Sequence, residues 1–375
     1  MTTIGTITYH KTINYGAILQ TYALQRTLVD MGYVSEIIDY WNPQTQIAAF
    51  SRYRRVRHFV WHGLVKKMLV GTKRQRKTEE FRRKYLRLSV RNYPNAEILR
   101  SDPPLYDAYI TGSDQVWNPR INNNDSSYFL TFVPQGKRTI SYAASFGVSQ
   151  IQDKFASYYK KWLKQIDSLS TREVEGKQII KQLTGRDAEI VLDPTLLLDQ
   201  EQWCRIAVPY KSSKPYILCY YMPGDKEVNK SITELARQVS TLTGWGVICL
   251  GQKEYMRLLH PWRRSIFDAG PAEFLGLFQN ASFIVTNSFH GTAFAVNYRK
   301  PFFVPINQEL APEKALSSRI TTLMKTLKLE YRLLPVGGCL PSGDVLDMDY
   351  QSVETILQQE KQRSIDFLRN ALGEA

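Results

Sequence analysis

The chain has 375 residues and a mass of 43.3 kDa, with 43% hydrophobic residues, 12% aromatic residues and a formal net charge of +14. This length exceeds what one hydrophobic core usually organises, and the composition is not that of a disordered, collagen-like or disulfide-stapled protein. We therefore expect two globular domains.

Strand-like runs alternate with helical patterns along most of the chain, which is typical of α/β layers with parallel sheets. In the first half we expect strands at 3–8, 34–40, 108–111, 139–145, 168–171 and 189–193, and helices at 17–31, 79–88, 152–166 and 173–183. In the second half we expect strands at 216–221, 247–250, 283–286 and 302–304, and helices at 226–242, 272–280, 290–298, 317–329 and 350–372.

The pattern predicts an α/β protein with two Rossmann-like domains in tandem. Pro194, Pro209 and Pro215 flank and interrupt a stretch in which the apolar period is lost, so the boundary is expected near 199–214. We assign 1–203 to an N-terminal domain with a basic helical insert at about 51–91. We assign 204–340 to a C-terminal domain and 341–375 to a last helix that crosses back to the N-terminal domain.

Nearly all of the net charge lies in the segment 51–91, which has fifteen basic residues and two acids, Glu79 and Glu80. Apolar residues recur there at helical spacing from Val56 to Leu69, as in a helix that lies on an anionic membrane surface. The alternative is a solvated basic helix packed on its own domain. No zinc finger, RRM signature or KH loop accompanies the charge, so we expect no nucleic-acid partner.

Export and metal binding are not indicated. Residues 1–10 lack the cationic and apolar parts of a signal peptide, and no run approaches about 18 uninterrupted apolar residues. The four cysteines form no C-x-x-C pair, which favours reduced thiols, and no H-x-x-x-H pattern is present. The sequence therefore predicts a cytoplasmic protein without a metal, peripheral at a membrane face.

Ligands of doubly wound sheets bind beyond the carboxyl ends of the strands, where several polar loops occur in this chain. After the first expected strand, Gly16 in the stretch from Asn14 to Gln20 permits close approach to a helix N-terminus. An ordinary strand-to-helix turn would look similar. The G-x-G-x-x-G spacing is missing, so a dinucleotide site is not supported.

The loop 112–118 combines small and hydrogen-bonding side chains with an aromatic ring: Ser113, Asp114, Gln115, Trp117 and Asn118. Polar groups beside an aromatic face suit a sugar. Capping of a helix by Ser113 or Asp114 explains the same residues equally well.

His290 lies in the most distinctive segment, Asn-Ser-Phe-His-Gly-Thr-Ala at 287–293, directly after an expected strand. Backbone donors, the helix dipole and an imidazole can face one phosphate or carboxylate there, so we favour a functional over a structural role. Arg172 lies at the start of an expected helix, where a cation opposes the dipole unless an anion is bound. Lys314 and Arg319 precede or begin the next helix, although surface charges would also explain them.

Taken in order, the segments 14–20, 112–118, 141–147, 170–173, 193–195 and 288–292 resemble the polysaccharide pyruvyl transferase family. The resemblance extends from about residue 5 to about residue 330 and leaves out the basic segment and the last helix. It implies a GT-B-like pair of Rossmann-like domains that transfers the pyruvyl group of phosphoenolpyruvate onto a sugar, usually as a cyclic ketal. The acceptor would be a precursor of capsule, exopolysaccharide or a cell-wall polymer, often carried on a polyprenyl lipid at the inner face of the cytoplasmic membrane.

The resemblance also implies roles for individual residues. The family's histidine falls on His290, the proposed acid/base or phosphate-protonating group. The arginine of the family's Ser-x-Arg-Glu/Asp stretch falls on Arg172. The donor-binding residues would be Arg172, Lys314, Arg319, Ser288, Gly291 and Thr292. The acceptor-binding residues would be Asn14, Gln20, Ser113, Asp114, Gln115, Trp117 and Asn118. No cofactor or metal is needed, because Arg and Lys can neutralise a leaving phosphate.

One departure and two alternatives remain. Some branches of the family have Arg where this chain has Ser288, so a cation for the donor must come from elsewhere. A GT-B glycosyltransferase that uses a nucleotide sugar would share the fold, but no acidic residue in the second half is convincingly placed to hold a ribose. A non-catalytic polysaccharide- or membrane-binding protein is the other alternative.

Overall fold

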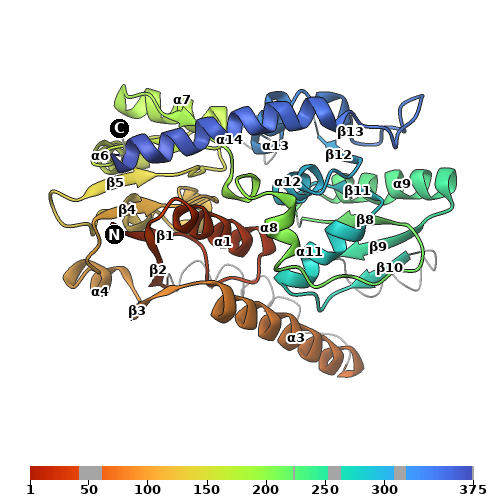
Figure 1. Ribbon diagram of the computed structural model, residues 1–375, viewed down its shortest axis with the longest axis horizontal. Helices are drawn as coiled ribbons and strands as arrows, with labels where there is room; N and C mark the ends of the chain where they lie inside the picture. Colours follow the sequence, from red (N-terminus) through yellow and green to blue (C-terminus); the bar gives the residue numbers. More distant parts are fainter. Residues whose placement is uncertain (42–60, 223, 252–262, 308–317, 374–375) are drawn as a thin grey trace.

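The computed structural model describes residues 1–41, 61–222, 224–251, 263–307 and 318–373, with side chains omitted for 61–72. The expected Lys314 and most of the apolar part of the basic segment lie outside this description. Figure 1 shows two α/β halves side by side along the long axis.

The first half contains a parallel sheet in the order β3-β2-β1-β4-β5. Its strands are β1 (Thr3–Ile7), β2 (Val34–Tyr40), β3 (Leu88–Tyr93), β4 (Ala108–Thr111) and β5 (Arg138–Ser141). The short β6 (Ser170–Thr171) and β7 (Glu189–Ile190) pair with each other and adjoin β5 through a bridge between Ile140 and Ser168. The helices are α1 (Tyr15–Asp30), α3 (Trp61–Tyr85), α4 (Ala96–Ser101), α5 (Pro119–Asn122), η1 (Ser126–Phe129), α6 (Asp153–Lys164) and α7 (Val174–Thr184).

The second half contains a parallel sheet in the order β10-β9-β8-β11-β12-β13. Its strands are β8 (Tyr216–Tyr220), β9 (Gly246–Leu250), β10 (Arg263–Ile266), β11 (Phe283–Thr286), β12 (Phe302–Ile306) and β13 (Leu333–Pro335). The connecting and flanking helices are η2 (Pro194–Leu196), α8 (Gln200–Cys204), α9 (Lys226–Thr243), α11 (Pro271–Asn280), α12 (Phe289–Asn297), α13 (Ser318–Thr326), η4 (Glu330–Arg332) and α14 (Tyr350–Leu372).

Both sheets have the strand order of a Rossmann-like domain. The first strand is central, the second and third lie on one side of it, and the fourth and fifth lie on the other. The central strands β4, β8 and β11 are buried along their whole length, because helices cover both faces of each sheet. The α/β class and the two Rossmann-like domains in a GT-B-like arrangement are thus confirmed.

A shared apolar core joins the two halves. Tyr15 and Ile18 of α1 belong to the same buried cluster as Phe274 of α11 and Phe294 of α12. The rings of Tyr15 and Phe274 stack with centroids 4.7 Å apart, and the Tyr15 hydroxyl donates to the Ala269 carbonyl at 2.8 Å. The N-terminus of α1 is therefore fixed against the second half.

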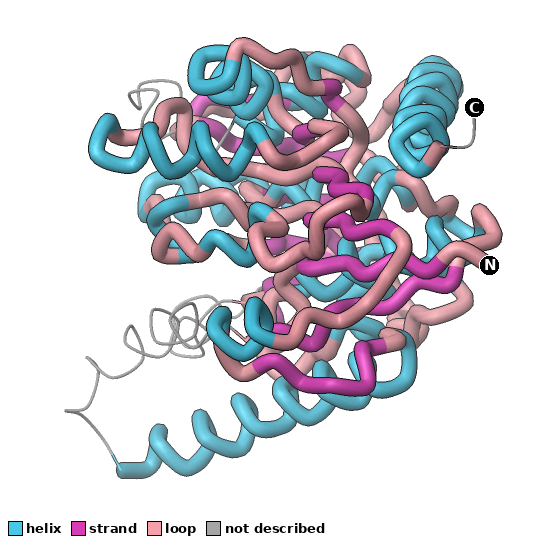
Figure 2. The backbone as a smooth tube through the Cα atoms, turned by 90° about the vertical axis from the view of Figure 1, so that its left-hand side faces the viewer, coloured by secondary structure: helices cyan, strands magenta, loops and turns pink. Residues whose placement is uncertain are grey.

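The last helix, α14, runs along both halves (Figure 1), and Figure 2 shows it nearly end-on at the edge of the molecule, next to the C-terminus. Near its start, Tyr350 donates to the Lys300 carbonyl at 2.5 Å in the second half. Near its end, the Ser364 hydroxyl accepts from the Leu192 amide at 3.0 Å, and Leu368 is buried in the core of the first half. This helix braces the two sheets on one side of the molecule.

The described part of α3 packs on the opposite side in Figure 1. Lys77 pairs with Glu273 of α11 at 2.8 Å, while Phe81 is buried against Tyr22 of α1. The C-terminal part of the basic segment thus contacts both halves. Among the described residues, no helix is long and apolar enough to cross a membrane.

Candidate active site

His290 lies where the two halves meet. It is in the first turn of α12, whose N-cap Ser288 accepts from the Gly291 amide at 3.3 Å. Its imidazole lies against Gly16 at the start of α1, where an added Cβ would be 2.0 Å from Nδ1 of His290. Any larger residue at position 16 would displace the ring. Two helix N-termini, each a favourable place for an anion, therefore converge on one histidine.

The nearest acidic group to this ring is Asp193, which precedes η2. Its Oδ2 lies 3.7 Å from Nε2 of His290 and accepts from the Ser113 hydroxyl at 2.7 Å. Burial alone would raise the pKa of Asp193, but His290 and Arg172, together with the Ser113 hydroxyl, hold it well below its usual range. Asp193 thus stays ionised beside the imidazole. Nε2 of His290 is buried without a hydrogen-bond partner among the described residues.

Arg172 is the buried counter-ion of this carboxylate. Its Nη1 lies 2.6 Å from Asp193, its Nη2 lies 3.3 Å from Asp114, and its guanidinium covers the ring of Phe289 at 4.7 Å. Burial lowers the pKa of Arg172, but Asp193, Asp114 and Glu173 raise it more. With 3% of its surface exposed, Arg172 fixes the positions of Asp193 and Asp114.

Arg319, on α13, is the second guanidinium of the cluster. Burial and the like charge of Arg172 lower its pKa to about 10, although Glu173, Asp114 and Asp193 act in the opposite direction. Within the described ranges, no carboxylate lies within ion-pair distance of it. Arg319 therefore carries a charge at neutral pH that an anionic ligand would stabilise.

Glu173 completes the cluster. Its Oε1 accepts from the Ser145 hydroxyl at 2.9 Å and from the Phe146 amide at 3.0 Å, and its Oε2 is buried without a hydrogen-bond partner among the described residues. Burial raises the pKa of Glu173 despite the opposing effect of Arg172 and Arg319. The cluster so contains three carboxylates and two guanidiniums around His290.

The loop 112–118 borders the same cluster and is held in an unusual conformation. Asp114 has a φ of 77°, in the left-handed region that few residues other than glycine adopt. Its carboxylate accepts from the Gln115 amide at 2.8 Å as well as contacting Arg172. Backbone strain of this kind is concentrated at functional sites.

The structure removes several residues from the expected acceptor and donor contacts. Trp117 has 0% of its surface exposed, donates from Nε1 to the Tyr128 carbonyl at 2.9 Å and stacks on Phe129, so its ring cannot face a sugar. Gln20 is buried and donates to the Thr8 hydroxyl at 2.9 Å. Both belong to the core of the first half, so their side chains are not placed to contact an acceptor sugar.

Two hydroxyls are likewise used internally. Ser113 binds Asp193, as described above, and Thr292 donates to the Ser288 carbonyl at 3.1 Å. Gly291 is packed closely: an added Cβ would lie 2.5 Å from Oγ1 of Thr286 and 3.0 Å from the ring of Tyr220. These residues pack against the cluster and hold it in position.

Of the remaining expected acceptor residues, Asn118 is buried, whereas Asn14, Asp114 and Gln115 keep some access. Asn14 is half-buried and caps α1 by accepting from the Ala17 amide at 3.3 Å. Gln115 is half-buried and accepts from Asn118 at 2.7 Å, while Asp114 is 9% exposed. They lie at the carboxyl ends of β1 and β4, on the first-half side of the cluster.

Sequence reasoning assigned no role to Asp193 or Glu173. Both lie in segments that resemble the family, but their contacts with Arg172 and His290 depend on the fold. A charged residue in a short apolar segment after a strand, as in Val-Leu-Asp-Pro at 191–194, was the available signal.

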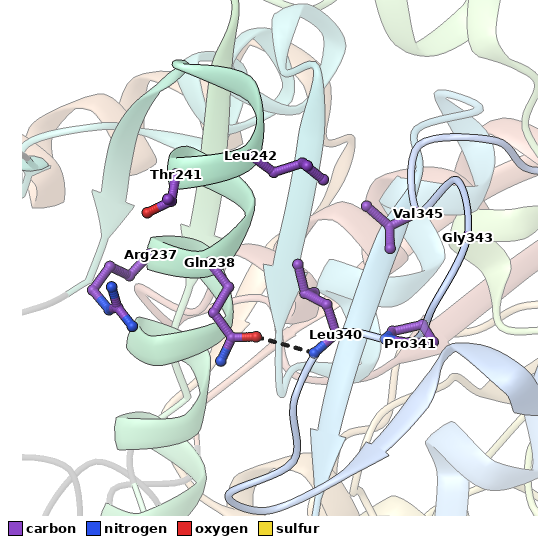
Figure 3. Close-up of a pocket in the computed structure, with 8 residues that line it drawn as sticks. All are labelled: Arg237, Gln238, Thr241, Leu242, Leu340, Pro341, Gly343 and Val345. Carbon is purple, nitrogen blue, oxygen red and sulfur yellow. Dashed lines mark hydrogen bonds between the residues drawn. The ribbon is translucent and has the colours of Figure 1, made fainter.

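Neither of two hollows on the surface coincides with this cluster. A groove of about 410 Å³ lies between α9 and the loop before α14 and is lined mainly by aliphatic groups such as Leu242 and Leu340 (Figure 3). Another, of about 590 Å³, lies near the connection between the halves, beside Tyr210 and Asp268. No group of three or more metal-ligating side chains occurs in the described part of the chain.

The family model of the polysaccharide pyruvyl transferases matches residues 14–307. The chain belongs to this family. The matched range includes Gly16, Arg172, Asp193 and His290, whereas Lys314 and Arg319 lie beyond it. No curated protein sequence matches the chain.

Solved structures with a similar course of the chain include sugar-nucleotide enzymes. The UDP-GlcNAc 2-epimerase of Neisseria meningitidis, bound to UDP-GlcNAc, is 9% identical, with 99% of this chain and 94% of that chain covered and a TM-score of 0.45. The UDP-GlcNAc 2-epimerase of Methanocaldococcus jannaschii is 13% identical, with 98% and 99% covered and a TM-score of 0.47. The ADP-heptose heptosyltransferase II of E. coli is 14% identical, with 97% and 99% covered and a TM-score of 0.35.

Proposed function

We propose that this pyruvyl transferase uses phosphoenolpyruvate as the donor and forms a pyruvate ketal on a sugar of a polysaccharide precursor, with release of phosphate. The observation that supports this most is the cluster of His290, Asp193, Arg172 and Arg319 between the two halves. It combines an imidazole that can transfer protons, an ionised carboxylate beside it and a buried cation without an ion-pair partner in the described ranges.

Donor binding depends on fixed cations, because phosphoenolpyruvate carries a carboxylate and a phosphate. In this proposal Arg319 binds one of these groups directly, and Lys314 supplies a further cation. The amides at the N-terminus of α12, which lack partners within the helix, add donors for an anion. Arg172 acts as a positioning residue, since its terminal nitrogens are engaged by Asp193 and Asp114.

The first step is protonation of the donor. Protonated His290 gives the Nε2 proton to C3 of the enol, the electron pair of the C2–C3 double bond forms the new C–H bond, and C2 acquires oxocarbenium character. A sugar hydroxyl oxygen attacks C2 and returns its proton to the imidazole. Asp193, ionised beside the ring, stabilises the imidazolium in each protonated stage.

The second step closes the ketal. The C2–O bond to phosphate breaks, the electron pair leaves with phosphate, and His290 protonates the leaving group. A second hydroxyl attacks C2 and loses its proton to the imidazole, which restores the starting state. One acceptor proton thus ends in the new methyl group and the other on phosphate. The residues present suffice for this chemistry without a cofactor.

Removal of the histidine tests the assignment. We expect His290→Ala to lose pyruvyl transfer, measured by mass spectrometry of lipid-linked acceptors incubated with phosphoenolpyruvate. Arg172→Ala should lose it as well, whereas Arg299→Ala, which removes an exposed partner of Glu354, should not. Retained activity in a folded His290→Ala protein would remove the histidine from the mechanism.

We also propose that the basic segment 51–91 holds the enzyme at the inner face of the cytoplasmic membrane, next to a polyprenyl-linked acceptor. Four exposed cations of α3, Lys73, Arg76, Arg83 and Lys84, are available to anionic lipids. Changing these four to Gln should weaken binding to vesicles that contain phosphatidylglycerol and leave binding to neutral vesicles unchanged. Equal binding of both proteins to the anionic vesicles would contradict membrane attachment through these residues.

A further inference from the structure

Arg74 brings the charge of the basic helix to the junction of the two halves. It lies on α3 and is half-buried, in contrast to its exposed neighbours Lys73 and Arg76. Its guanidinium carbon is 4.2 Å from the ring centre of Tyr15, and its Nη2 donates to the Ile13 carbonyl at 2.8 Å. Arg74 is therefore held at the N-terminus of α1, beside the glycine on which His290 rests.

The second half of the molecule faces the same guanidinium. Tyr220, at the carboxyl end of β8, contacts Ser288, and its ring centre is 6.1 Å from that of Tyr15. Burial raises the pKa of Tyr220 to about 12, and the nearby charge of Arg74 and the hydrogen bond with Ser288 oppose this rise. Arg74 thus lies near the N-terminus of α12 as well as that of α1.

The charge of Arg74 is not neutralised by the protein. Within the described ranges no carboxylate forms an ion pair with it, and its buried Nε has no hydrogen-bond partner. A guanidinium has five N–H donors, and buried donors are normally paired, so the arrangement suits a ligand that supplies acceptor oxygens. The carbonyl of Ile13 accounts for one donor only.

The neighbouring cluster explains why a further cation is needed there. Around His290, three carboxylates outnumber two guanidiniums, so these five groups offer no net positive charge to a doubly anionic molecule. A ligand with two separate anionic groups requires a cation for each. Arg74 and Arg319 come from different elements, α3 and α13, and both are cations without a carboxylate partner among the described residues.

We propose that Arg74 forms an anion subsite of the cleft, between the N-termini of α1 and α12, for a phosphate or carboxylate group of the substrate. This inference rests on the proposed function for the identity of the substrate, but the subsite itself is defined by a guanidinium that has no carboxylate partner in the described ranges and a buried Nε without a hydrogen bond. It makes the basic helix a wall of the substrate cleft in addition to any contact with lipids.

Calorimetry with variants of the full chain tests the subsite. Arg74→Gln should bind phosphoenolpyruvate about 10- to 100-fold more weakly than the unaltered protein, as expected for loss of one charge-assisted contact. Arg237→Gln is the matched control, because it removes an exposed arginine of α9 that pairs with Glu234. Its affinity should not change. Arg74→Lys, which keeps the charge, should bind phosphoenolpyruvate more tightly than Arg74→Gln does. Its affinity should fall as the KCl concentration increases.

The outcomes separate this inference from the proposed function. Equal affinity of Arg74→Gln and the unaltered protein would overturn the subsite and leave the donor assignment intact. If the unaltered protein binds inorganic phosphate through Arg74 but does not bind phosphoenolpyruvate, the subsite stands and the donor assignment fails. If Arg74→Gln proves unfolded, Arg74→Met decides, because it removes the charge and keeps an unbranched apolar side chain against Tyr15. Unchanged affinity of a folded Arg74→Met protein would show that the guanidinium serves only to hold Tyr15 and Ile13.

Discussion

At the scale of single residues, the contact between Gly16 and His290 is the most demanding feature of the site. By helix propensity alone, alanine in place of a glycine within a helix would stabilise the protein by about 1 kcal/mol. The added Cβ would lie 2.0 Å from Nδ1 of His290, however, and this overlap outweighs the propensity.

We therefore expect Gly16→Ala to displace the imidazole and to lower the rate of pyruvyl transfer by at least about 100-fold, the cost of a misplacement of roughly 1 Å. Gly246→Ala is the control, since a Cβ there meets no atom within 4 Å. Steady-state rates of the two variants provide the comparison. A Gly16→Ala protein with ordinary activity would show that the ring position is not critical.

Asp193 combines a role at the site with a role in stability. Asp193→Asn leaves Arg172 buried beside a neutral group, which should cost about 3–5 kcal/mol of unfolding free energy, and it should also abolish most of the activity. Asp187→Asn, which removes an exposed partner of Lys181, should change the free energy of unfolding far less, because solvent screens that pair. Urea titrations of both variants measure this difference.

The pH dependence follows from the direction of the shift. Because the pKa of Asp193 is lowered by folding, its stabilising contribution is complete above the pKa of an unfolded aspartate, about 3.9, and is lost as the pH falls further. The difference in unfolding free energy between the unaltered protein and Asp193→Asn should be constant near neutral pH and should shrink below about pH 4. A difference that grows on acidification would contradict the assigned ion pair.

Sequence alone predicted part of this site at the residue scale. His290 and Arg172 follow strands at loops where ligands of such sheets bind, and the family resemblance supplied Arg319. The prediction that Trp117 contacts a sugar was wrong, because an aromatic residue after a strand can point into the core as easily as toward a ligand. Nothing in the local sequence distinguishes the two orientations. The contact of Gly16 with His290 depends on how the two halves meet, which no local pattern encodes.

At the scale of secondary structure, long periodic elements were predicted best. The last helix was expected at 350–372 and is observed as Tyr350–Leu372. The edge strands β3 and β10 were not predicted: β3 exposes three consecutive residues, and β10 has the polar sequence RRSI. Edge strands lack the buried alternation on which strand prediction depends.

The helix α14 offers a test at this scale, because it holds both halves with few residues. Leu368 has 0% of its surface exposed in the core of the first half, so Leu368→Ala should cost about 2–5 kcal/mol of unfolding free energy. Gln359→Ala, at an exposed position of the same helix, should change stability by less than about 0.5 kcal/mol. Thermal unfolding of the two variants distinguishes a bracing helix from a peripheral one.

At the scale of the whole molecule, the alternation of strands and helices sufficed to predict two Rossmann-like domains. It did not predict that α1 would share a core with α11 and α12, which brings Gly16 and His290 together at the candidate site. Nor did it predict that the basic segment, judged from its charge to lie on a membrane, would send Arg74 toward the cleft and Lys77 to Glu273. The sequence gives the total charge of a segment, whereas the fold determines where each cation lies.

The central claim is that the space between the halves accommodates a small doubly anionic enol ester. Calorimetric titration of the unaltered protein and of Arg319→Gln with phosphoenolpyruvate, and separately with UDP-GlcNAc, tests it most directly. We predict that phosphoenolpyruvate binds, that Arg319→Gln weakens this binding about 10- to 100-fold, and that the nucleotide sugar does not bind. Binding of UDP-GlcNAc without any binding of phosphoenolpyruvate would contradict the account.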